Sequence, residues 1–415
     1  MPRFPLEGVR VLDFTHFVAG PHCTMWLASL GAEVLKIESP RRPDAFRLSQ
    51  LRAGIEPSLN NSPIFVTTNL GKKSVAVDIS TREGQEICQR IASASDVVTA
   101  NFRPGVLEHF NLDYAVLSKI NPSIVMAAIT GYGYYSDYAA FQALGPNIHA
   151  FAGLSHVTGY VDGPPENWFS TYADVVVGHV TALSILAALG ERERTGEGVF
   201  IDTAMSEALI SVAPAGVLHA AMIGSDLERR GNEEPGRAPH GCYPCRGDDR
   251  WIAIATFDEA DWHSLVQILG VQRLAADPRF GTIDNRWRNR LLLDEELGNA
   301  TRGWDAFELA ALLQQSMVAA SPTRTAKDIL QDDDLAREGF LRVVDQPELG
   351  PALQAMLPWS LEPLQDHEHW ATPAPGFGTH TYEVLRDLAG VDDDEWCVLL
   401  ERGVVAGRPT EEAIS

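Results

Sequence analysis

The sequence predicts an α/β protein built around a doubly wound parallel sheet. Short, β-rich apolar runs recur through the first half of the 415-residue chain: GVRVLDF, EVLKIE, SVAVDI, DVVTAN and SIVMAAIT. Segments of helical character separate them, and strands that alternate with helices of roughly 10–15 residues are typical of parallel sheets. Because these runs are apolar nearly throughout, we expect helices to cover both faces of the sheet.

Local signals place the first helices between these strands. Pro21 suits the first position of a helix over PHCTMWLASLG, and Gly31 suits its stop. Ser80 and Glu83 have the spacing of a capping box, which predicts that the next long helix begins at Ser80. Further on, the stretch from Val175 to Leu189 is apolar nearly all round, which predicts a helix buried on most sides.

The second half of the chain changes character at a Gly- and Pro-rich charged segment, GSDLERRGNEEPGRAP, which is typical of a linker. After it, RWIAIAT predicts a strand and DEADWHSLVQILG an amphipathic helix, followed by charged helical sequence. We therefore expect a large domain over 1–224, a smaller α+β domain over 225–342, and a C-terminal segment over 343–415.

Charge and composition exclude several classes of protein. The chain has 33 Lys and Arg against 56 Asp and Glu, a net charge of −23. Such a surface repels nucleic acid and anionic membranes, so neither is an expected partner. We find no apolar run of the roughly 18 residues that a membrane span needs and no signal-peptide pattern. Five cysteines, an odd number, fit the reduced cytoplasm.

One cysteine pair has metal-ligand spacing. Cys242 and Cys245 stand in HGCYPC, beside His240. A tetrahedral metal site needs a second such pair, which the sequence does not offer, so we expect no metal here.

Basic residues gather in loops next to the predicted strands. In a parallel sheet the loops at the carboxyl ends of the strands carry the ligand site. Arg41, Arg42 and Arg103 follow predicted strands of this kind, whereas Lys72 and Lys73 precede the strand SVAVDI, and all five fall in loops of one sheet. Brought together, they would suit a ligand with several phosphates, while dispersed they would be ordinary surface charges. The loop after the first strand lacks the G-x-G-x-x-G pattern, which argues against a nicotinamide oxidoreductase.

Asp174 stands just before the apolar helix and has two interpretations. Asp is among the best N-caps, so it could simply cap the helix. Alternatively, the helix N-terminus lowers the pKa of the carboxyl group and partial desolvation makes the carboxylate reactive. An ionised, partly desolvated carboxylate is a suitable nucleophile for a thioester carbonyl.

The ordered segments of the chain resemble the class III CoA-transferases of the CaiB/BaiF type, whose relatives include formyl-CoA transferase and α-methylacyl-CoA racemase. The resemblance rests on GVRVLDFTHFVAGPHCTMWLASLGAEVLKIE, NLGKKSVAVDI, NFRPGVLEHFNL, ITGYG, DGPP, TYADVVVG, ILAALGERERTGEG, APHGCYPC and FGTHTYEVLRDLAG. These segments follow family order over nearly the whole chain.

The resemblance implies a Rossmann-like large domain, a small domain, and a C-terminal segment that returns to the first, with two chains interlocked as rings in a homodimer. It also implies that Asp174 is the nucleophile and that Lys72 binds the CoA phosphates. The residues that it places at CoA or the reacting thioester are His16, Phe17, Val18, Ala19, Asn101, Phe102 and His109. Gly241 is a candidate oxyanion donor together with the loop after the first strand.

The chain departs from its expected relatives at several positions. Formyl-CoA transferases carry glutamine where this chain has Val18, and arginine where it has Ser39, a task that Arg41 or Arg42 is expected to take over. A formyl or oxalyl substrate is therefore disfavoured. In the racemase branch a catalytic histidine occupies the place of Pro146, and His149 is nearby but out of position, which disfavours α-proton exchange.

The resulting expectation is a cytoplasmic CoA-transferase that moves CoA from an acyl-CoA to a carboxylic acid. The reaction would pass through an anhydride and an aspartyl-CoA thioester on Asp174, with CoA as substrate and no other cofactor. The alternatives are an acyl-CoA racemase or isomerase on the same fold, and a non-catalytic acyl-CoA binder.

Overall fold

The computed structural model describes residues 4–49, 58–167, 171–359 and 372–407. The chain forms two compact units. The first comprises Met1–Ser155, Asn167–Ile223 and Asp333–Ser415, and the second comprises His156–Glu166 and Gly224–Asp332. The predicted domain limits, 1–224, 225–342 and 343–415, stay a prediction.

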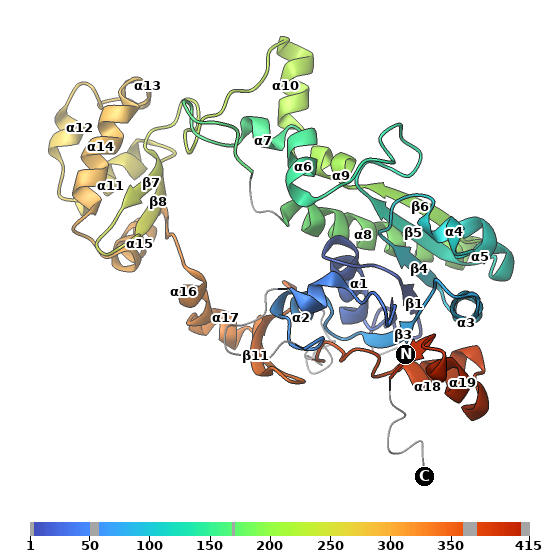
Figure 1. Cartoon of the computed structure of the whole chain (residues 1–415). Coiled ribbons are helices and arrows are strands. Elements are labelled where there is room, and N and C mark those ends of the chain that lie inside the picture. Colours follow the sequence, from blue (N-terminus) through green and yellow to red (C-terminus); the bar gives the residue numbers. More distant parts are fainter. Residues whose placement is uncertain (1–3, 50–57, 168–170, 360–371, 408–415) are drawn as a thin grey trace. The chain divides into compact units, whose positions relative to one another are not determined.

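A large, mainly parallel sheet forms the centre of the first unit, as the apolar runs predict (Figure 1). It has seven strands in the order β12-β3-β2-β1-β4-β5-β6. Their bounds are β1 Arg10–Asp13, β2 Glu33–Glu38, β3 Lys73–Val77, β4 Val97–Ala100, β5 Val125–Thr130, β6 Val199–Ala204 and β12 Val405–Ala406. All pairings are parallel except that of β12 with β3. The strand order reverses at β1, where open α/β sheets form their ligand crevice.

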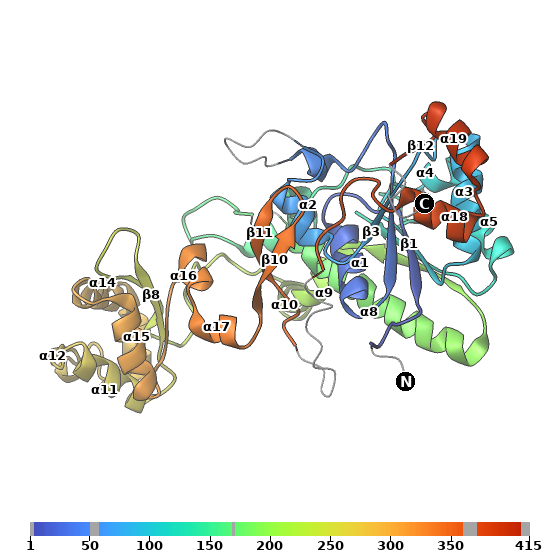
Figure 2. The ribbon, with the colours of Figure 1, turned by 90° about the horizontal axis from the view of Figure 1, so that it is seen from below.

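Helices cover both faces of this sheet (Figure 2). One face packs against α1 (Ala19–Ser29), α2 (Pro63–Thr68), α8 (Tyr172–Thr195) and α9 (Met205–Val212). The other packs against α3 (Arg82–Ser93), α5 (Tyr114–Ile120), α18 (Thr381–Ala389) and α19 (Asp393–Glu401). Adjacent residues Val11 and Leu12 enter opposite cores, as the two-residue period of a strand requires. The doubly wound arrangement is therefore confirmed.

The remaining elements of the first unit are short and lie mostly in connections. They are η1 (Ala45–Leu48), α4 (Val106–His109), α6 (Gly145–Phe151), α7 (Leu154–Val157), α10 (Ala215–Ile223), α17 (Asp333–Arg337) and the hairpin β10 (Leu341–Gln346) with β11 (Gly350–Ala355). α7 runs across the limit between the two units. One sequence signal was misplaced by a residue: the cap of α3 is Thr81, whose side chain accepts from the Gly84 N–H, and not Ser80.

α8 is a core helix of the first unit. It is long and apolar enough to meet the length and hydropathy test for a membrane span, a test that the central helix of a soluble protein also meets. Val177 and Ile185 are fully buried against the sheet. At Gly178, a Cβ atom would approach the Ala19 carbonyl oxygen of α1 to 3.0 Å. Glycine thus allows the backbones of α1 and α8 to come close, which sets the spacing near Asp174.

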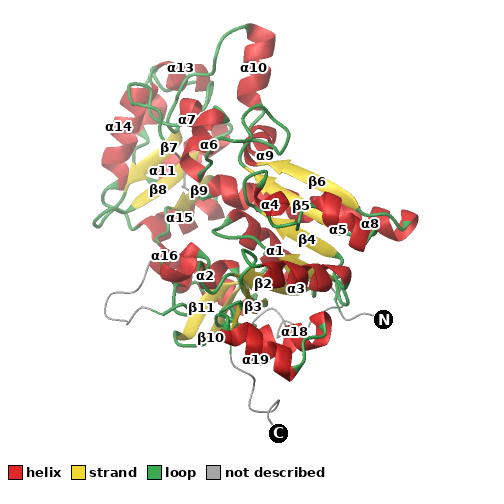
Figure 3. Ribbon diagram, turned by 45° about the vertical axis from the view of Figure 1, so that its right-hand side comes forward, coloured by secondary structure: helices red, strands yellow, loops and turns green. Residues whose placement is uncertain are grey.

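The second unit has its own sheet and core (Figure 3). Its antiparallel strands are β7 (His240–Pro244), β8 (Trp251–Ala255) and β9 (Ala319–Pro322). Its helices are α11 (Glu259–Ile268), α12 (Arg273–Ala276), α13 (Ile283–Arg288), α14 (Arg290–Thr301), α15 (Ala306–Gln315) and α16 (Ala326–Leu330). Trp262 and Phe280 are among its fully buried side chains, so this unit has a hydrophobic core that it does not share.

Candidate active site

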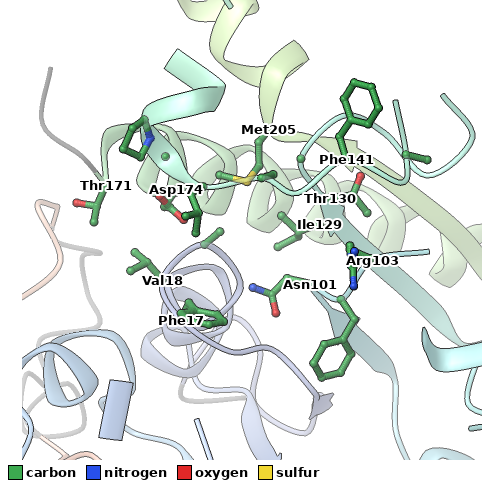
Figure 4. Close-up of a pocket in the computed structure, with 18 of the residues that line it drawn as sticks. Phe17, Val18, Asn101, Arg103, Ile129, Thr130, Phe141, Thr171, Asp174 and Met205 are labelled. Atoms are coloured by element: carbon green, nitrogen blue, oxygen red, sulfur yellow. The ribbon is translucent and has the colours of Figure 1, made fainter. Parts of the chain in front are cut away.

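A cavity of about 330 Å³ lies in the first unit where β1, β4 and β5 end (Figure 4). The loop after β1 contributes Phe17, Val18 and Ala19, and the loop after β4 contributes Asn101, Phe102 and Arg103. Asp174 comes from the first turn of α8. Seven residues predicted from the sequence therefore line one cavity, at the edge of the sheet where a parallel α/β fold binds its ligand.

Asp174 is the third residue of α8 and not its N-cap. The helix begins at Tyr172 and its N-cap is Thr171. The capping interpretation of Asp174 is therefore wrong. Its side chain lines the cavity, in the turn where helix N–H groups favour a negative charge.

Burial controls the acidity of Asp174. Desolvation raises the pKa of its carboxyl group from 3.8 to about 6, while its own backbone N–H and that of Ala19 act in the lowering direction. The expectation that the helix N-terminus would hold this pKa low is wrong, because desolvation is the larger effect. The carboxylate is nevertheless mostly ionised at neutral pH, and it is held at a higher free energy than a solvated one.

The loop after β1 is strained and firmly held. Phe17 has φ = 66°, in the left-handed region, which costs a bulky residue on the order of 1–3 kcal/mol. Its N–H donates to Asp44 Oδ1 at 3.2 Å. The neighbouring His16 donates its N–H to Asn101 Oδ1 at 2.8 Å, and its carbonyl accepts from Asn101 Nδ2 at 2.7 Å. Asn101 thus fixes the loop that carries Val18 and Ala19 to the cavity.

Beneath this loop lies a buried cluster of paired charges. Lys36 Nζ donates to the Thr15 carbonyl at 2.6 Å and lies 3.0 Å from Asp44 Oδ2. Burial is the largest single influence on the pKa of Asp44 and would raise it. The charges of Lys36 and His16 and the hydrogen bonds from Phe46 and Lys36 together outweigh burial, and the pKa is lowered overall. Since Asp44 also accepts from Phe17, the strained loop is anchored to a fixed negative charge.

Lys72 belongs to the same cluster and does not line the cavity. Its ammonium is fully buried, 3.3 Å from Asp13 Oδ2 and 2.7–2.9 Å from the Pro21 carbonyl, Thr24 Oγ1 and Asn69 Oδ1. Burial lowers its pKa to about 8. A lysine has three N–H donors, and here four acceptors of the chain surround them. Lys72 therefore has its partners within the chain, and its predicted contact with the CoA phosphates stays a prediction.

The other predicted basic residues do not gather at the cavity. Arg41 is exposed and pairs with Asp78 at 3.3 Å, and Arg42 is exposed. Lys73 pairs with Glu33 and Glu383, each at 2.9 Å. Among the predicted basic side chains of the described chain, Arg103 alone lines the cavity. The structure therefore does not bring these cations together at this cavity, and their contact with a phosphate-bearing ligand stays a prediction.

Two further predicted positions lie beside or away from the cavity lining. The His16 ring packs against Phe102 at 5.5 Å between centroids, behind the lining residues. His109 is exposed with its ring 5.0 Å from that of Phe110. Neither histidine lines the cavity.

Gly241 belongs to the second unit. It lies in β7 and lines a separate cavity of about 520 Å³ there. In the same strand, Cys242 is exposed, while the following Cys245 is buried. Within the described ranges, no three His, Cys, Asp or Glu side chains are grouped as a metal site would need.

Sequence reasoning missed the far wall of the Asp174 cavity. Lining residues that it did not single out are Phe46, Ile129, Thr130, Gly131, Ala139, Phe141, Ala143, Leu144, Gly145, Thr171 and Met205. Thr130 and Gly131 follow β5 directly, so the rule that sites form at strand ends could have found them. Pro146 also lines the cavity, whereas His149 is buried behind it with no hydrogen-bond partner on either ring nitrogen.

Of the described residues that line this cavity, Asp174 alone carries a carboxyl, imidazole or thiol group. The site therefore offers one ionisable nucleophile, an amide from Asn101, hydroxyl groups from Thr130 and Thr171, one guanidinium from Arg103, and apolar walls. Such a constellation suits acyl transfer through a carboxylate.

Comparison with known proteins shows the family to which the chain belongs. Residues 6–381 match the model of CoA-transferase family III. The chain is 32% identical to succinyl-CoA--D-citramalate CoA-transferase of Chloroflexus aurantiacus, over 97% of this chain and 99% of that protein. It is also 32% identical to succinyl-CoA:mesaconate CoA-transferase of Haloarcula hispanica, over 93% and 96%.

A solved structure extends the comparison to the fold. A CaiB/BaiF family protein from Brucella suis superposes with a TM-score of 0.84 at 29% identity, covering 93% of this chain and 99% of that one. The chain therefore belongs to CoA-transferase family III and is a CoA-transferase. The resemblance drawn from its ordered segments is confirmed.

Proposed function

We propose that this enzyme moves CoA from an acyl-CoA donor to a carboxylic acid acceptor through covalent intermediates on Asp174. The observation that carries the proposal is the position of this carboxylate. It is half-buried, its pKa is about 6, and it lines a cavity whose other described residues carry no carboxyl, imidazole or thiol group that could compete as base or nucleophile. A carboxylate in this state is both ionised and poorly solvated, which favours attack on a thioester.

The proposed reaction has four steps. A carboxylate oxygen of Asp174 attacks the thioester carbonyl, the C–S bond breaks, and CoA leaves as thiolate, which gives a mixed anhydride. The thiolate attacks the aspartyl carbonyl, a C–O bond breaks, and the donor acid leaves as carboxylate, which leaves an aspartyl-CoA thioester. The acceptor carboxylate then repeats these two steps in reverse order. Each step exchanges a carboxylate and a thiolate, so no net proton transfer is needed.

The Ala19 N–H supports this chemistry. In the resting enzyme it acts on the Asp174 carboxylate and favours its charged form. Because acylation removes that charge, the N–H becomes available to an oxyanion formed at the same carbonyl. Its position depends on the loop that Asn101 and Asp44 hold.

The balance of these steps also bears on cofactors and assembly. Since every bond that forms or breaks belongs to Asp174, CoA or a carboxylic acid, we propose that no cofactor or metal is required. We also retain the expectation that the enzyme is a cytoplasmic homodimer of interlocked chains with a Rossmann-like large domain, all features implied by its resemblance to the CaiB/BaiF type.

The test is the first half of the reaction, followed by intact-protein mass spectrometry. Wild-type enzyme mixed with an acyl-CoA and no acceptor should gain the mass of CoA less water and release one equivalent of acid. Asp174→Asn should lose at least about a thousandfold in rate, as expected for removal of a nucleophile. Glu207→Ala, an exposed acid in the first turn of α9, serves as the control and should behave as wild type. Full activity of Asp174→Asn would overturn the proposal.

A racemase is the alternative on the same fold. It needs a base near the α-carbon, but Pro146 stands where the racemase branch has its histidine, and His149 does not line the cavity. Uptake of solvent deuterium at the α-carbon, without an acceptor acid, would support the racemase and not the transferase.

A further inference from the structure

The walls of the Asp174 cavity are apolar and come from distant segments of the first unit. The apolar lining residues are Phe17, Val18, Ala19, Phe46, Phe102, Pro104, Ile129, Ala139, Phe141, Ala143, Leu144, Pro146 and Met205. Val18, Ala19, Ile129 and Met205 are each buried, with at most 7% of their surface exposed. The part of the cavity formed by these four residues is therefore buried and fixed in shape, whereas Phe17, Phe141 and Leu144 of the same lining are 48%, 55% and 69% exposed.

Aromatic contacts brace two sides of this cavity. Phe17 meets Phe46 edge to face, with centroids 5.4 Å apart and an angle of 81°. Phe141 packs against Tyr138 at 5.4 Å and against Tyr132 at 6.0 Å. Figure 4 shows Phe17 and Val18 on one side of the labelled residues, and Phe141 on another. Tilted and edge-to-face arrangements of this kind are favourable for aromatic rings, so these walls offer ring faces and edges to a bound group.

The charges of the cavity oppose a second negative group. Asp174 is itself an anion, and Arg103 is the one cation among the described lining residues. Arg103 is exposed, in the loop after β4, so water screens its charge. A free carboxylate on the acyl chain would therefore lose its hydration beside apolar walls and near a like charge, without a buried partner.

We infer that the acyl subsite is specific for apolar monocarboxylic acyl groups of aryl size, in place of the dicarboxylic acyl groups that the relatives' names specify. The inference deepens the proposed function and rests on it. The volume agrees: an apolar cavity of roughly 150 Å³ is enough to bind benzene, and this cavity has about 330 Å³. Phe17, Phe46 and Phe141 are the specificity-determining residues.

The test compares donors in the same half-reaction, using phenylacetyl-CoA, 3-phenylpropanoyl-CoA and succinyl-CoA with the full-length enzyme. The expected result is a kcat/KM for formation of the CoA adduct at least about tenfold higher for the aryl donors, since a mismatch in a shaped pocket costs tenfold or more. A preference for succinyl-CoA would overturn the inference and leave the proposed function intact. If no donor gave an adduct on Asp174, the proposed function itself would fail.

Two variants test whether Phe141 determines the preference for aryl donors over succinyl-CoA. Phe141→Ala should lower kcat/KM for 3-phenylpropanoyl-CoA by about tenfold and narrow the ratio between aryl donors and succinyl-CoA. Tyr135→Ala removes a neighbouring ring that is 80% exposed and does not line the cavity, and it should leave the ratio unchanged. Equal effects of the two variants would contradict the role of Phe141. Thermal unfolding of both variants controls for loss of fold.

Discussion

Two aspartates at the carboxyl edge of the same sheet show how partners decide the fate of a buried acid. Asp13, at the end of β1, is fully buried, yet its pKa is lowered, because Lys72, Lys36 and two threonine hydroxyls outweigh desolvation. Asp174, on α8, is less buried and has only backbone N–H groups acting on it, and its pKa rises to about 6. Burial acts to raise the pKa of both aspartates, and the presence or absence of a nearby cation decides whether the net shift is downward or upward.

The difference teaches which acid can react. Asp13 accepts from Thr15 at 2.6 Å and from Thr24 at 2.7 Å, and it lies 3.3 Å from Lys72 Nζ. Its oxygens are thus occupied and its charge stabilises the fold. Asp174 lines a cavity and keeps its charge at a free-energy cost, which an electrophile can relieve. One sheet edge therefore holds a structural aspartate beneath the loop and, under the proposed function, the nucleophile beside it.

Removing the cation of the buried cluster should have the largest effect on stability. Lys72→Met leaves Asp13 without its closest cation in a dry environment, and we expect a loss of about 3–5 kcal/mol in the free energy of unfolding. Denaturant unfolding followed by circular dichroism measures it. A change below about 1 kcal/mol would mean that Lys72 is not a structural cation.

Asn101 connects the cluster to catalysis. Asn101→Leu removes both hydrogen bonds to the His16 backbone and leaves two partly buried polar groups unpaired, which should cost about 1–3 kcal/mol of stability. Because the strained Phe17 turn then loses its anchor, kcat should fall more than KM rises. Asn101→Asp, which keeps the acceptor for the His16 N–H, should recover part of kcat. Loss of stability with unchanged kcat would show that the position of this loop does not affect the rate of the reaction.

The pH dependence separates the two aspartates further. The kcat/KM of the half-reaction should fall about tenfold per unit once the pH is below the Asp174 pKa of about 6, because the protonated acid is not a nucleophile. Since this pKa lies above its usual 3.8, the ionised group destabilises the fold, fully so above pH 6, and the penalty shrinks as the pH falls from 6 toward 3.8. Asp174→Asn should therefore not lower the melting temperature at pH 7.

Lys73 gives the smallest expected effect and the matched control for Lys72. It is partly exposed, and its ion pairs with Glu33 and Glu383 lie near the surface. Surface pairs contribute about 0–1 kcal/mol each, so Lys73→Met should change stability by about 1 kcal/mol or less and leave kcat unaltered. A cost equal to that of Lys72→Met would remove the contrast between the buried and the exposed lysine.

Several features of the fold and site could be predicted from the sequence because they are local. The apolar strands and the two-residue alternation of Val11 and Leu12 give a sheet covered on both faces. The strand-end rule places Phe17, Val18, Asn101 and Arg103 at one edge. These residues follow their strands directly, so they stay in the loop after the strand even if the predicted end of the strand is wrong by one residue.

Other features depend on contacts between distant segments. Lys72 and Lys73 are adjacent in the sequence, and only the packing of α1, through the Pro21 carbonyl and Thr24, decides that Lys72 points inward. The pairing of Phe17 with Phe46 likewise needs η1, which carries Phe46, to pack against the loop after β1. The pKa of Asp174 could not be predicted either, because the extent of desolvation is a property of the packed helix and not of its sequence.

The most direct measurement is the chemical location of the covalent intermediate. Enzyme incubated with an acyl-CoA is quenched, treated with hydroxylamine, digested, and sequenced by tandem mass spectrometry. The account predicts a hydroxamate on Asp174 within TYADVVVG, formed only when acyl-CoA was present. The Glu207→Ala control should carry the same hydroxamate on Asp174 and none at another site. An unmodified Asp174 in an enzyme that still exchanges CoA between acids would contradict it.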